Sequence, residues 1–297
     1  MKNIELVNSF NISFRKLTQT KKDYELLYNW CKNKYVYEWF EQRSLSYEEI
    51  VNKYKNKIDN KKQDLYIIQA NSKDIGLVQI YKFENDIKIN DLDSFQNIYE
   101  YDLFIGEEEY LNKGIGKKIV NEINDLIYKK YNADSIILRP FKRNKRAVNC
   151  YKKCNYEIFY EYESTDTIGN KETIIVLLNK LNRWTFGIDI EILINLVLDG
   201  KKTATTSLYE LDSVPEVGEL SVLTDSFNNN VCLLKTNKVI ITEFKNITWN
   251  LAKLEGEDNS LNEWKEKHIE YFNKLDSNFN ENTKVIFEIF EVIKKWK

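Results

Sequence analysis

The chain has 297 residues, of which 42% are hydrophobic and 30% charged, a balance typical of soluble globular proteins with room for two separate cores. No apolar run is long enough to span a bilayer, and the opening MKNIELVNSF lacks the apolar core of a signal peptide, so we expect a cytoplasmic protein. The four cysteines form no Cys-x-x-Cys pair, which argues against a disulfide or zinc framework. The single histidine, His268, excludes a His-rich metal site, and we expect no metal.

Charge is unevenly distributed along the chain. Residues 1–183 carry 31 Lys and Arg against 27 Asp and Glu, whereas residues 184–297 carry 13 against 19, so the balance changes from +4 to −6. Between Glu84 and Glu109 nine acids accompany one base, and between Lys113 and Lys153 twelve bases accompany three acids. Such blocks are either solvated faces or the two sides of a site where a cationic ligand meets an anionic one, and the sequence leaves both open.

The first 180 residues alternate strand and helix patterns. We expect strands at 12–17, 64–70, 75–83, 99–106, 135–140, 156–162 and 173–178, and helices at 21–32, at 47–58, after residue 116 and at 145–153. A turn around Lys73 and Asp74 should join the second and third strands as a hairpin. This order predicts an α+β fold with a central, mostly antiparallel sheet flanked by helices.

A different pattern begins near Trp184. An apolar-periodic helix at 188–200 leads into the turn signals VPEVG and SFNNN and into short strands typical of a small β-barrel. We therefore predict two domains, residues 1–181 and 184–297.

Two short motifs carry the functional argument. LNKGIGKKIV, at 111–120, matches neither the P-loop nor the dinucleotide fingerprint, but a glycine turn that opens a helix still offers free N–H groups to an anion. NKRAVNCYKKCNYE, at 144–157, reads as a helix capped by Asn144, with Asn155 in the left-handed conformation at its end. Taken alone, the first motif is better explained as a loop that starts a helix, and the second as an ordinary amphipathic helix with a buried tyrosine.

Together the motifs resemble the GNAT acetyltransferase superfamily, in which a Gln/Arg-x-x-Gly-x-Gly/Ala turn binds the pyrophosphate of coenzyme A and an Asn-x-x-Ala-x-x-x-Tyr helix flanks its pantetheine arm. Asn112 stands where the family prefers Gln or Arg, and Asn155-Tyr156 replaces its Gly-Phe, both mild departures. The resemblance implies acetyl-CoA as the cofactor. The residues it implies for cofactor binding are Phe104, Ile105, Lys113, Gly114, Ile115, Gly116, Lys117, Asn144 and Ala147.

Over roughly residues 10–180 the sequence looks like the aminoglycoside 6′-N-acetyltransferases, which are antibiotic resistance enzymes. YVYEWFEQRSLSYEEI resembles their substrate-side region, where aromatic residues line the pocket, so the likeness places Trp39 at the substrate. Glu107 and Glu108 would help to gather a small cationic aminoglycoside, unless they form a solvated acidic loop. Arg139 is a departure, because the family commonly has an acidic residue there and an arginine would repel a polycation unless it points toward coenzyme A.

Acetylation of an amine sets its own requirements. An ammonium cannot attack a thioester, so a carboxylate must take or relay its proton, and the resemblance gives this role to Asp102. It further implies that a backbone N–H between Phe104 and Glu107 polarises the thioester carbonyl. Tyr151 is the implied donor to the departing thiolate.

The second part of the chain resembles an ASCH domain, a small barrel related to the RNA-binding PUA folds, from FGIDIEILINLVLDGKKTATTSL onward. Some members hydrolyse N4-acetylcytidine with a Lys, a Thr and a Glu, and the matching positions are Lys202, Thr205 and Glu255. A lysine made neutral by burial could activate the threonine; equally, Lys202 and Thr205 bind only a ligand phosphate or backbone. Because these two residues lie three apart, a shared site requires a turn-like or helical backbone. His268 is expected to be structural.

Three functions remain open from the sequence. The first is an acetyl-CoA-dependent aminoglycoside 6′-N-acetyltransferase with an appended ASCH domain. The second is an acetyltransferase whose acceptor is instead a polyamine, a nucleoside or a protein amine. The reason for this alternative is Arg139, which departs from the acidic residue common in the aminoglycoside enzymes. The third is an RNA-associated binding module. The net charge of −6 in residues 184–297 argues against strong RNA binding, and a nucleoside-sized ligand fits this charge better.

Overall fold

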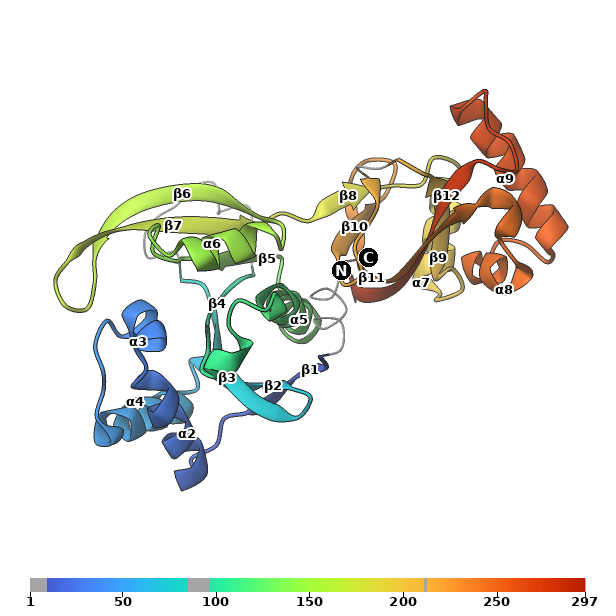
Figure 1. Ribbon diagram of the computed structural model, residues 1–297. Coiled ribbons are helices and arrows are strands. Elements are labelled where there is room, and N and C mark those ends of the chain that lie inside the picture. The colour runs from blue at the N-terminus through green and yellow to red at the C-terminus, as the bar shows by residue number, and fades with distance from the viewer. Residues whose placement is uncertain (1–9, 85–96, 211–212, 297) are drawn as a thin grey trace. The chain divides into compact units, whose positions relative to one another are not determined.

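The computed structural model describes residues 10–84, 97–210 and 213–296. The chain divides into two compact units, Met1–Lys180 and Leu181–Lys297, and each contains its own sheet (Figure 1). Part of the acidic block between Glu84 and Glu109 lies outside the described residues. Among the helices in these described ranges, none has both the length and the apolar character that crossing a bilayer would require.

The described strands of the first unit form one seven-stranded sheet in the order β1-β2-β3-β4-β5-β7-β6. Neighbouring strands are antiparallel except β4 and β5, which are parallel. The strands are β1 (Ile12–Lys16), β2 (Gln63–Ala70), β3 (Lys73–Lys82), β4 (Ile98–Ile105), β5 (Ser135–Leu138), β6 (Tyr156–Thr165) and β7 (Lys171–Asn179).

The sheet opens between β4 and β5. β4 pairs with β5 only from Ile98 to Glu100, while its other edge pairs with β3 from Tyr99 to Ile105. Within the described strands, residues 101–105 of β4 therefore have no paired β5 residue beside them. Backbone groups on this edge of β4 face away from the β3 ladder and are not used by a strand.

Helices cover both faces of this sheet. In the described residues they are α2 (Lys21–Cys31), α3 (Lys34–Phe40), α4 (Tyr47–Asn60), α5 (Ile115–Tyr131) and α6 (Lys145–Lys152). Local chemistry fixes their starts: Thr20 caps α2 by accepting from the Asp23 N–H, and Ser46 forms a capping box with Glu49 at α4.

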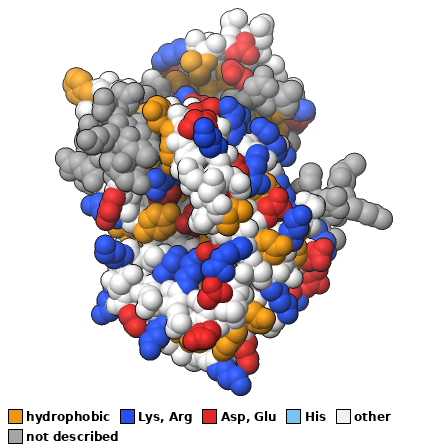
Figure 2. All heavy atoms as spheres, turned by 90° about the vertical axis from the view of Figure 1, so that its left-hand side faces the viewer, with side chains coloured by type: hydrophobic (Ala, Val, Ile, Leu, Met, Phe, Trp, Pro, Cys, Tyr) orange, Lys and Arg blue, Asp and Glu red, His pale blue; other side chains and the backbone are white. Residues whose placement is uncertain are grey.

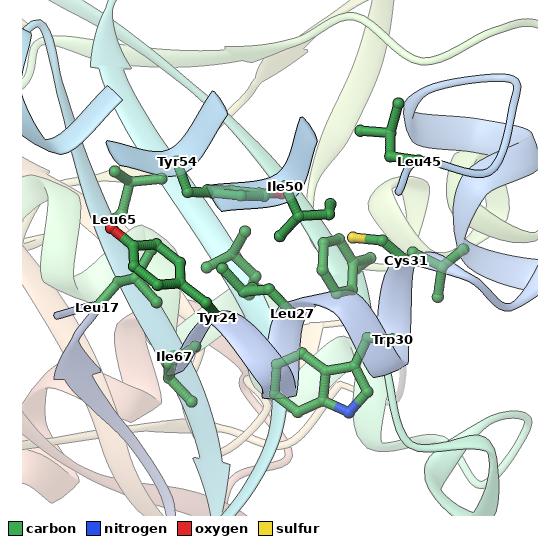
Figure 3. Packing of buried hydrophobic residues seen from close by; sticks show 13 residues of the cluster. Leu17, Tyr24, Leu27, Trp30, Cys31, Leu45, Ile50, Tyr54, Leu65 and Ile67 are labelled. Carbon is green, nitrogen blue, oxygen red and sulfur yellow. The ribbon is translucent and has the colours of Figure 1, made fainter. Parts of the chain in front are cut away.

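The two faces of the sheet carry different cores. Figure 3 shows Leu27 of α2 and Ile50 of α4 packed with Ile67 of β2, in a cluster that also contains Phe104 of β4. On the opposite face Tyr101 of β4 donates to Asn124 Oδ1 of α5 at 3.3 Å. Because successive strand side chains alternate, Asp102 projects with Phe104 on the α2–α4 face.

The second unit is a five-stranded half-barrel in the order β8-β10-β11-β12-β9, in which only β8 and β10 are parallel. α7 packs against β10 and β11 in one apolar cluster, and α8 and α9 pack against β9 and β12 in another. The elements are β8 (Asn182–Trp184), α7 (Ile190–Leu198), β9 (Ala204–Leu208), β10 (Leu220–Thr224), β11 (Asn230–Glu243), α8 (Trp249–Ala252), α9 (Leu261–Leu275) and β12 (Lys284–Lys295).

The predicted α+β class and mostly antiparallel sheet are confirmed, and each strand predicted in the first 180 residues is present. The predicted hairpin between β2 and β3 is confirmed, but the predicted position of its turn is wrong: the turn lies at Asn71 and Ser72, whose φ angles are 49° and 66°, and Lys73 already belongs to β3. Two-residue hairpin turns demand positive φ at both positions, which Asn tolerates better than most residues.

Candidate active site

Asp102 lies on β4 just beyond the last residue paired with β5. Tyr81 of β3 donates its hydroxyl to Asp102 Oδ2 at 3.0 Å. Water reaches this carboxylate, yet protein atoms crowd it on several sides, and this burial raises its pKa above the ordinary value. The hydrogen bond from Tyr81 opposes the rise, and so do the positive charges of Lys57, Arg139 and Lys53. A recessed carboxyl with a raised pKa is suited to receiving a proton from an amine.

Along β4, the backbone N–H groups point alternately toward β3 and toward the opening beside β5. The Gly106 N–H donates to Ile75 O at 2.8 Å and the Phe83 N–H to Ile98 O at 3.0 Å, so the even-numbered residues of β4 bond to β3. The N–H groups of Leu103 and Ile105 therefore point toward the side that β5 has left. By the same alternation the Phe104 N–H points to β3. Leu103 was not singled out from the sequence, because which N–H groups face the opening depends on the partner strand.

Gly114 begins α5 in a left-handed conformation, with φ 79°, which a residue with a Cβ adopts reluctantly. No side chain of the described residues caps this helix, and its first turn contains no acid. The preceding residues Asn112 and Lys113 are exposed. A Cβ placed on Gly116 would lie 3.1 Å from Cys150 Sγ, so the glycine permits α6 to approach. The segment from Lys113 to Lys117, Ile115 included, is thus the start of a helix whose N-cap residue supplies no side-chain cap, an arrangement suited to an anion.

α6 presents the second motif beside this helix start. Asn144 Oδ1 caps the helix by accepting from the Ala147 N–H at 3.2 Å, and Asn155 adopts the predicted left-handed conformation with φ 60°. Tyr151 is half-buried, and its pKa is raised by burial first and then by the negative charges of Cys150 and Asp102. Tyr151 and Asp102 are therefore within electrostatic range of each other, although 49 residues separate them.

The residues predicted at the substrate are largely engaged with protein partners. The Trp39 ring lies under the Arg143 guanidinium, with 4.7 Å between Arg143 Cζ and the ring centroid. Glu107 Oε1 accepts from the Trp30 indole N–H at 2.9 Å, whereas Glu108 is exposed in a short 3-10 turn, η2 (Glu108–Tyr110).

Arg139 forms an ion pair with Glu100, with Arg139 Nε 2.8 Å from Glu100 Oε1. Glu100 is a buried residue of β4, two positions before Asp102 and on the same face. The charge of Arg139 is thus partly neutralised by an acid that the sequence had not connected with it.

In the second unit Lys202 and Glu255 meet. Lys202 Nζ donates to Glu255 Oε2 at 2.9 Å, and the two side chains are 1% and 2% exposed. Thr206 donates to Glu255 Oε1 at 2.6 Å, and the Trp264 indole donates to the same oxygen at 3.1 Å. The cluster is a closed network in which polar groups satisfy one another.

Thr205 does not join this network. The expected turn-like or helical backbone is wrong, because β9 begins at Ala204 and alternation places Thr206, not Thr205, on the Lys202 side. The idea of a neutral lysine is also wrong. Burial lowers the pKa of Lys202, but the charges of Glu255 and Glu257 more than offset burial and raise its pKa overall.

Comparison with known proteins agrees with this division. Residues 19–163 match the family model described as acetyltransferase (GNAT) domain, and residues 182–294 match the one described as ASCH domain. Two curated relatives named aminoglycoside N(6′)-acetyltransferase type 1, from Klebsiella pneumoniae and Serratia marcescens, are each 23% identical over 161 residues, which cover 51% of this chain and 78% of the relative. A solved structure of an uncharacterized protein from Bacillus halodurans has a TM-score of 0.50 at 21% identity and covers 57% of this chain and 85% of its own, a likeness of fold alone. The chain therefore carries an acetyltransferase (GNAT) domain followed by an ASCH domain.

Proposed function

We propose that the first unit transfers an acetyl group from acetyl-CoA to a primary amine, with the 6′-amine of aminoglycosides as the first candidate acceptor. The observation that carries this proposal is the placement of Asp102 on β4, beyond the last β5 pair, at the opening toward which the N–H groups of Leu103 and Ile105 point. The GNAT family match to residues 19–163 supports it.

The helix start at Gly114 fits the diphosphate of coenzyme A. Gly114 at its N-cap has no capping side chain, a Cβ at Gly116 would crowd Cys150 Sγ, and Lys117 and Lys118 add positive charge in the first turn. Asn144 and Ala147 hold the start of α6 beside it. When bound, acetyl-CoA would supply the thioester that donates the acetyl group.

The residues of this chain then have separate tasks. Asp102 takes the proton that the acceptor ammonium must lose before its nitrogen can attack. The N–H groups of Leu103 and Ile105 donate toward the acetyl carbonyl oxygen and stabilise the charge that develops there. Tyr151 donates a hydrogen bond to the departing sulfur: its raised pKa keeps the hydroxyl protonated but makes it a weak acid, so the thiolate is stabilised by the hydrogen bond and takes its proton from solvent.

The aminoglycoside assignment rests on the relatives from Klebsiella pneumoniae and Serratia marcescens, which carry that name. The ion pair of Arg139 with Glu100 reduces the repulsion that an arginine at this position would exert on a cationic sugar. Trp39, Glu107 and Glu108 are the proposed acceptor-side residues.

A second acceptor class is favoured by the positive charges near Asp102. Lys57, Arg139 and Lys53 all lower its pKa, and positive charge beside the carboxyl disfavours further positive charge on the acceptor, so an amine of low total charge, such as a simple amino sugar, is the second candidate. Figure 2 shows acidic and basic side chains interspersed among the described residues on one face of the molecule, with no purely acidic surface there that would favour a polycation.

A screen of acceptors tests the function. Thiol release from acetyl-CoA would be followed with kanamycin, spermidine, an aminonucleoside and a lysine peptide, each against an Asp102→Asn control. Turnover that needs both an amine and Asp102 supports the proposal; thiol release that is independent of both contradicts it.

For the second unit we propose a role independent of acetyl transfer, with a nucleoside-sized ligand rather than RNA. The closed Lys202–Glu255 network supports a structural role for these two residues. Binding of N4-acetylcytidine to the full chain, measured by calorimetry and chromatography of the products, tests whether any such ligand is bound or hydrolysed.

A further inference from the structure

Three cationic side chains influence Asp102, and two of them have carboxylate partners. Arg139 pairs with Glu100 at 2.8 Å, and Lys53 contacts Glu41 directly. Within the described residues, the hydrogen-bond partner of Lys57 is the uncharged side chain of Gln79, whose Oε1 accepts from Lys57 Nζ. Burial lowers the pKa of Lys57, and the negative charge of Asp102 opposes this change, so the carboxylate that acts on Lys57 is Asp102 itself.

Gln79 holds the charge of Lys57 beside Asp102. Gln79 and Asp102 are directly opposed in the β3–β4 register, so their side chains project on the same face with Cβ atoms about 5 Å apart. Gln79 is 1% exposed and cannot swing away, and Lys57 Nζ also lies 5.9 Å from the centroid of the buried Tyr54 ring. Consistent with this placement, Lys57 is the largest of the charge influences on the Asp102 carboxyl.

We propose that Lys57 is a specificity-determining residue, which weakens the binding of acceptors that carry a second ammonium close to the reacting nitrogen, relative to acceptors that carry one. This inference rests on the proposed acetyl transfer at Asp102 and names the substrate class more closely. A single ammonium is attracted by Asp102, whereas a neighbouring ammonium on the same molecule is repelled by Lys57. At a separation of about 8 Å the repulsion corresponds to about two- to thirty-fold in binding, depending on the effective dielectric constant.

The experiment compares two acceptors that share a reacting group. 6-Amino-6-deoxyglucose presents one ammonium on the sugar ring, and kanamycin presents the same 6-amino ring with further ammonium groups. We expect Lys57→Gln to raise the ratio of kcat/KM for kanamycin to kcat/KM for the single amine about tenfold, mainly through the KM for kanamycin. The ratio between acceptors cancels any effect of the substitution on Asp102 itself, since that effect is common to both.

Two controls accompany this variant. Lys55→Gln removes an exposed lysine from the same helix and should leave the ratio unchanged. Lys57→Arg restores the charge and should return the ratio to that of the unaltered protein. Raising the ionic strength should narrow the difference between acceptors in the unaltered protein and leave it unchanged in Lys57→Gln.

The outcomes separate the two proposals. If both acceptors are turned over and Lys57→Gln changes them equally, or not at all, the role of Lys57 is refuted and the proposed function stands. If neither acceptor is turned over by any variant, and no other amine releases thiol from acetyl-CoA, the proposed function fails and this inference fails with it.

Discussion

At the scale of single residues, Asp102 is the proposed base, and its titration is testable. Only the ionised carboxylate can take up a proton, so kcat/KM should rise with pH through the pKa of Asp102. Because burial raises that pKa, the acidic limb should lie above the range of an ordinary aspartate. Asp102→Asn should lower kcat by about 10²- to 10⁴-fold and remove this limb from a stopped-flow pH profile. The same limb in the variant would show that another group acts as the base.

A substitution at Tyr81 tests the pKa of the Asp102 carboxyl in a second way. Its hydroxyl donates to Asp102 and so lowers the pKa of that carboxyl. Tyr81→Phe should move the acidic limb of kcat/KM to higher pH, with kcat at the alkaline plateau nearly unchanged. A limb that stays in place would mean that the hydrogen bond does not influence the group being titrated.

Lys202 is expected to be a stability residue. Lys202→Ala would leave Glu255 buried without its cation and should lower the free energy of unfolding of the second unit by about 3–5 kcal/mol. Lys201→Ala removes an exposed lysine next to it and should cost under about 0.5 kcal/mol. Urea unfolding followed by tryptophan fluorescence measures both. Equal effects would mean that the buried pair contributes nothing specific.

The same pair predicts how stability depends on pH. Although burial alone would raise it, the pKa of Glu255 is lowered to about 2, chiefly by the charge of Lys202, by the His268 ring nearby and by the hydrogen bond from Thr206. A lowered folded-state pKa gives stability that is complete above the ordinary glutamate value and is lost as pH falls toward about 2. Glu255→Gln should flatten this acid dependence in the second unit.

At the scale of elements, the start of α5 is the feature most open to test. Gly114→Val forces a β-branched residue to a φ of 79°, and Gly116→Val drives a side chain into Cys150 Sγ, so both variants should weaken acetyl-CoA binding more than tenfold. Gly200→Val is the matched control, because Gly200 has a φ of 72°, open space around it and a place in the second unit. The affinity of each variant for acetyl-CoA would be measured by calorimetry, and only variants with the helix content of the unaltered protein would be compared. Unchanged affinity in a folded Gly114→Val variant would refute this site.

The elements also show what a sequence can predict. Apolar periodicity is local, so helices and strands such as Ser135–Leu138 were found within a few residues. Which N–H groups of β4 bond to β3 depends on the register between the two strands, and the sequence of β4 alone does not contain this register. For that reason the sequence does not point to Leu103. Side chains alternate between the two faces of a strand, but which residue faces which side depends on where the strand starts. The sequence does not locate the start of β9, so it points to Thr205, whereas Thr206 faces the lysine. The partners of Lys57 and Arg139 come from other elements, and no spacing in the sequence reveals them.

At the scale of the whole molecule, each unit has its own sheet and its own apolar clusters. We therefore expect residues 1–181 alone to fold and to keep kcat/KM within about twofold of the full chain. The assay would be thiol release, with circular dichroism to establish folding. A folded truncation without turnover would make the second unit a working part of the transferase.

The central claim is that this chain acetylates an amine at Asp102, with the 6′-amine of aminoglycosides as the first acceptor. NMR of the product formed from kanamycin and acetyl-CoA labelled with ¹³C in the acetyl group tests it most directly. We predict one amide, at the 6′-nitrogen, formed by the full chain and not by Asp102→Asn. Acetate on a different nitrogen, or no labelled kanamycin at all, would contradict the account of the acceptor, and a 6′-amide formed equally by Asp102→Asn would contradict the account of the site.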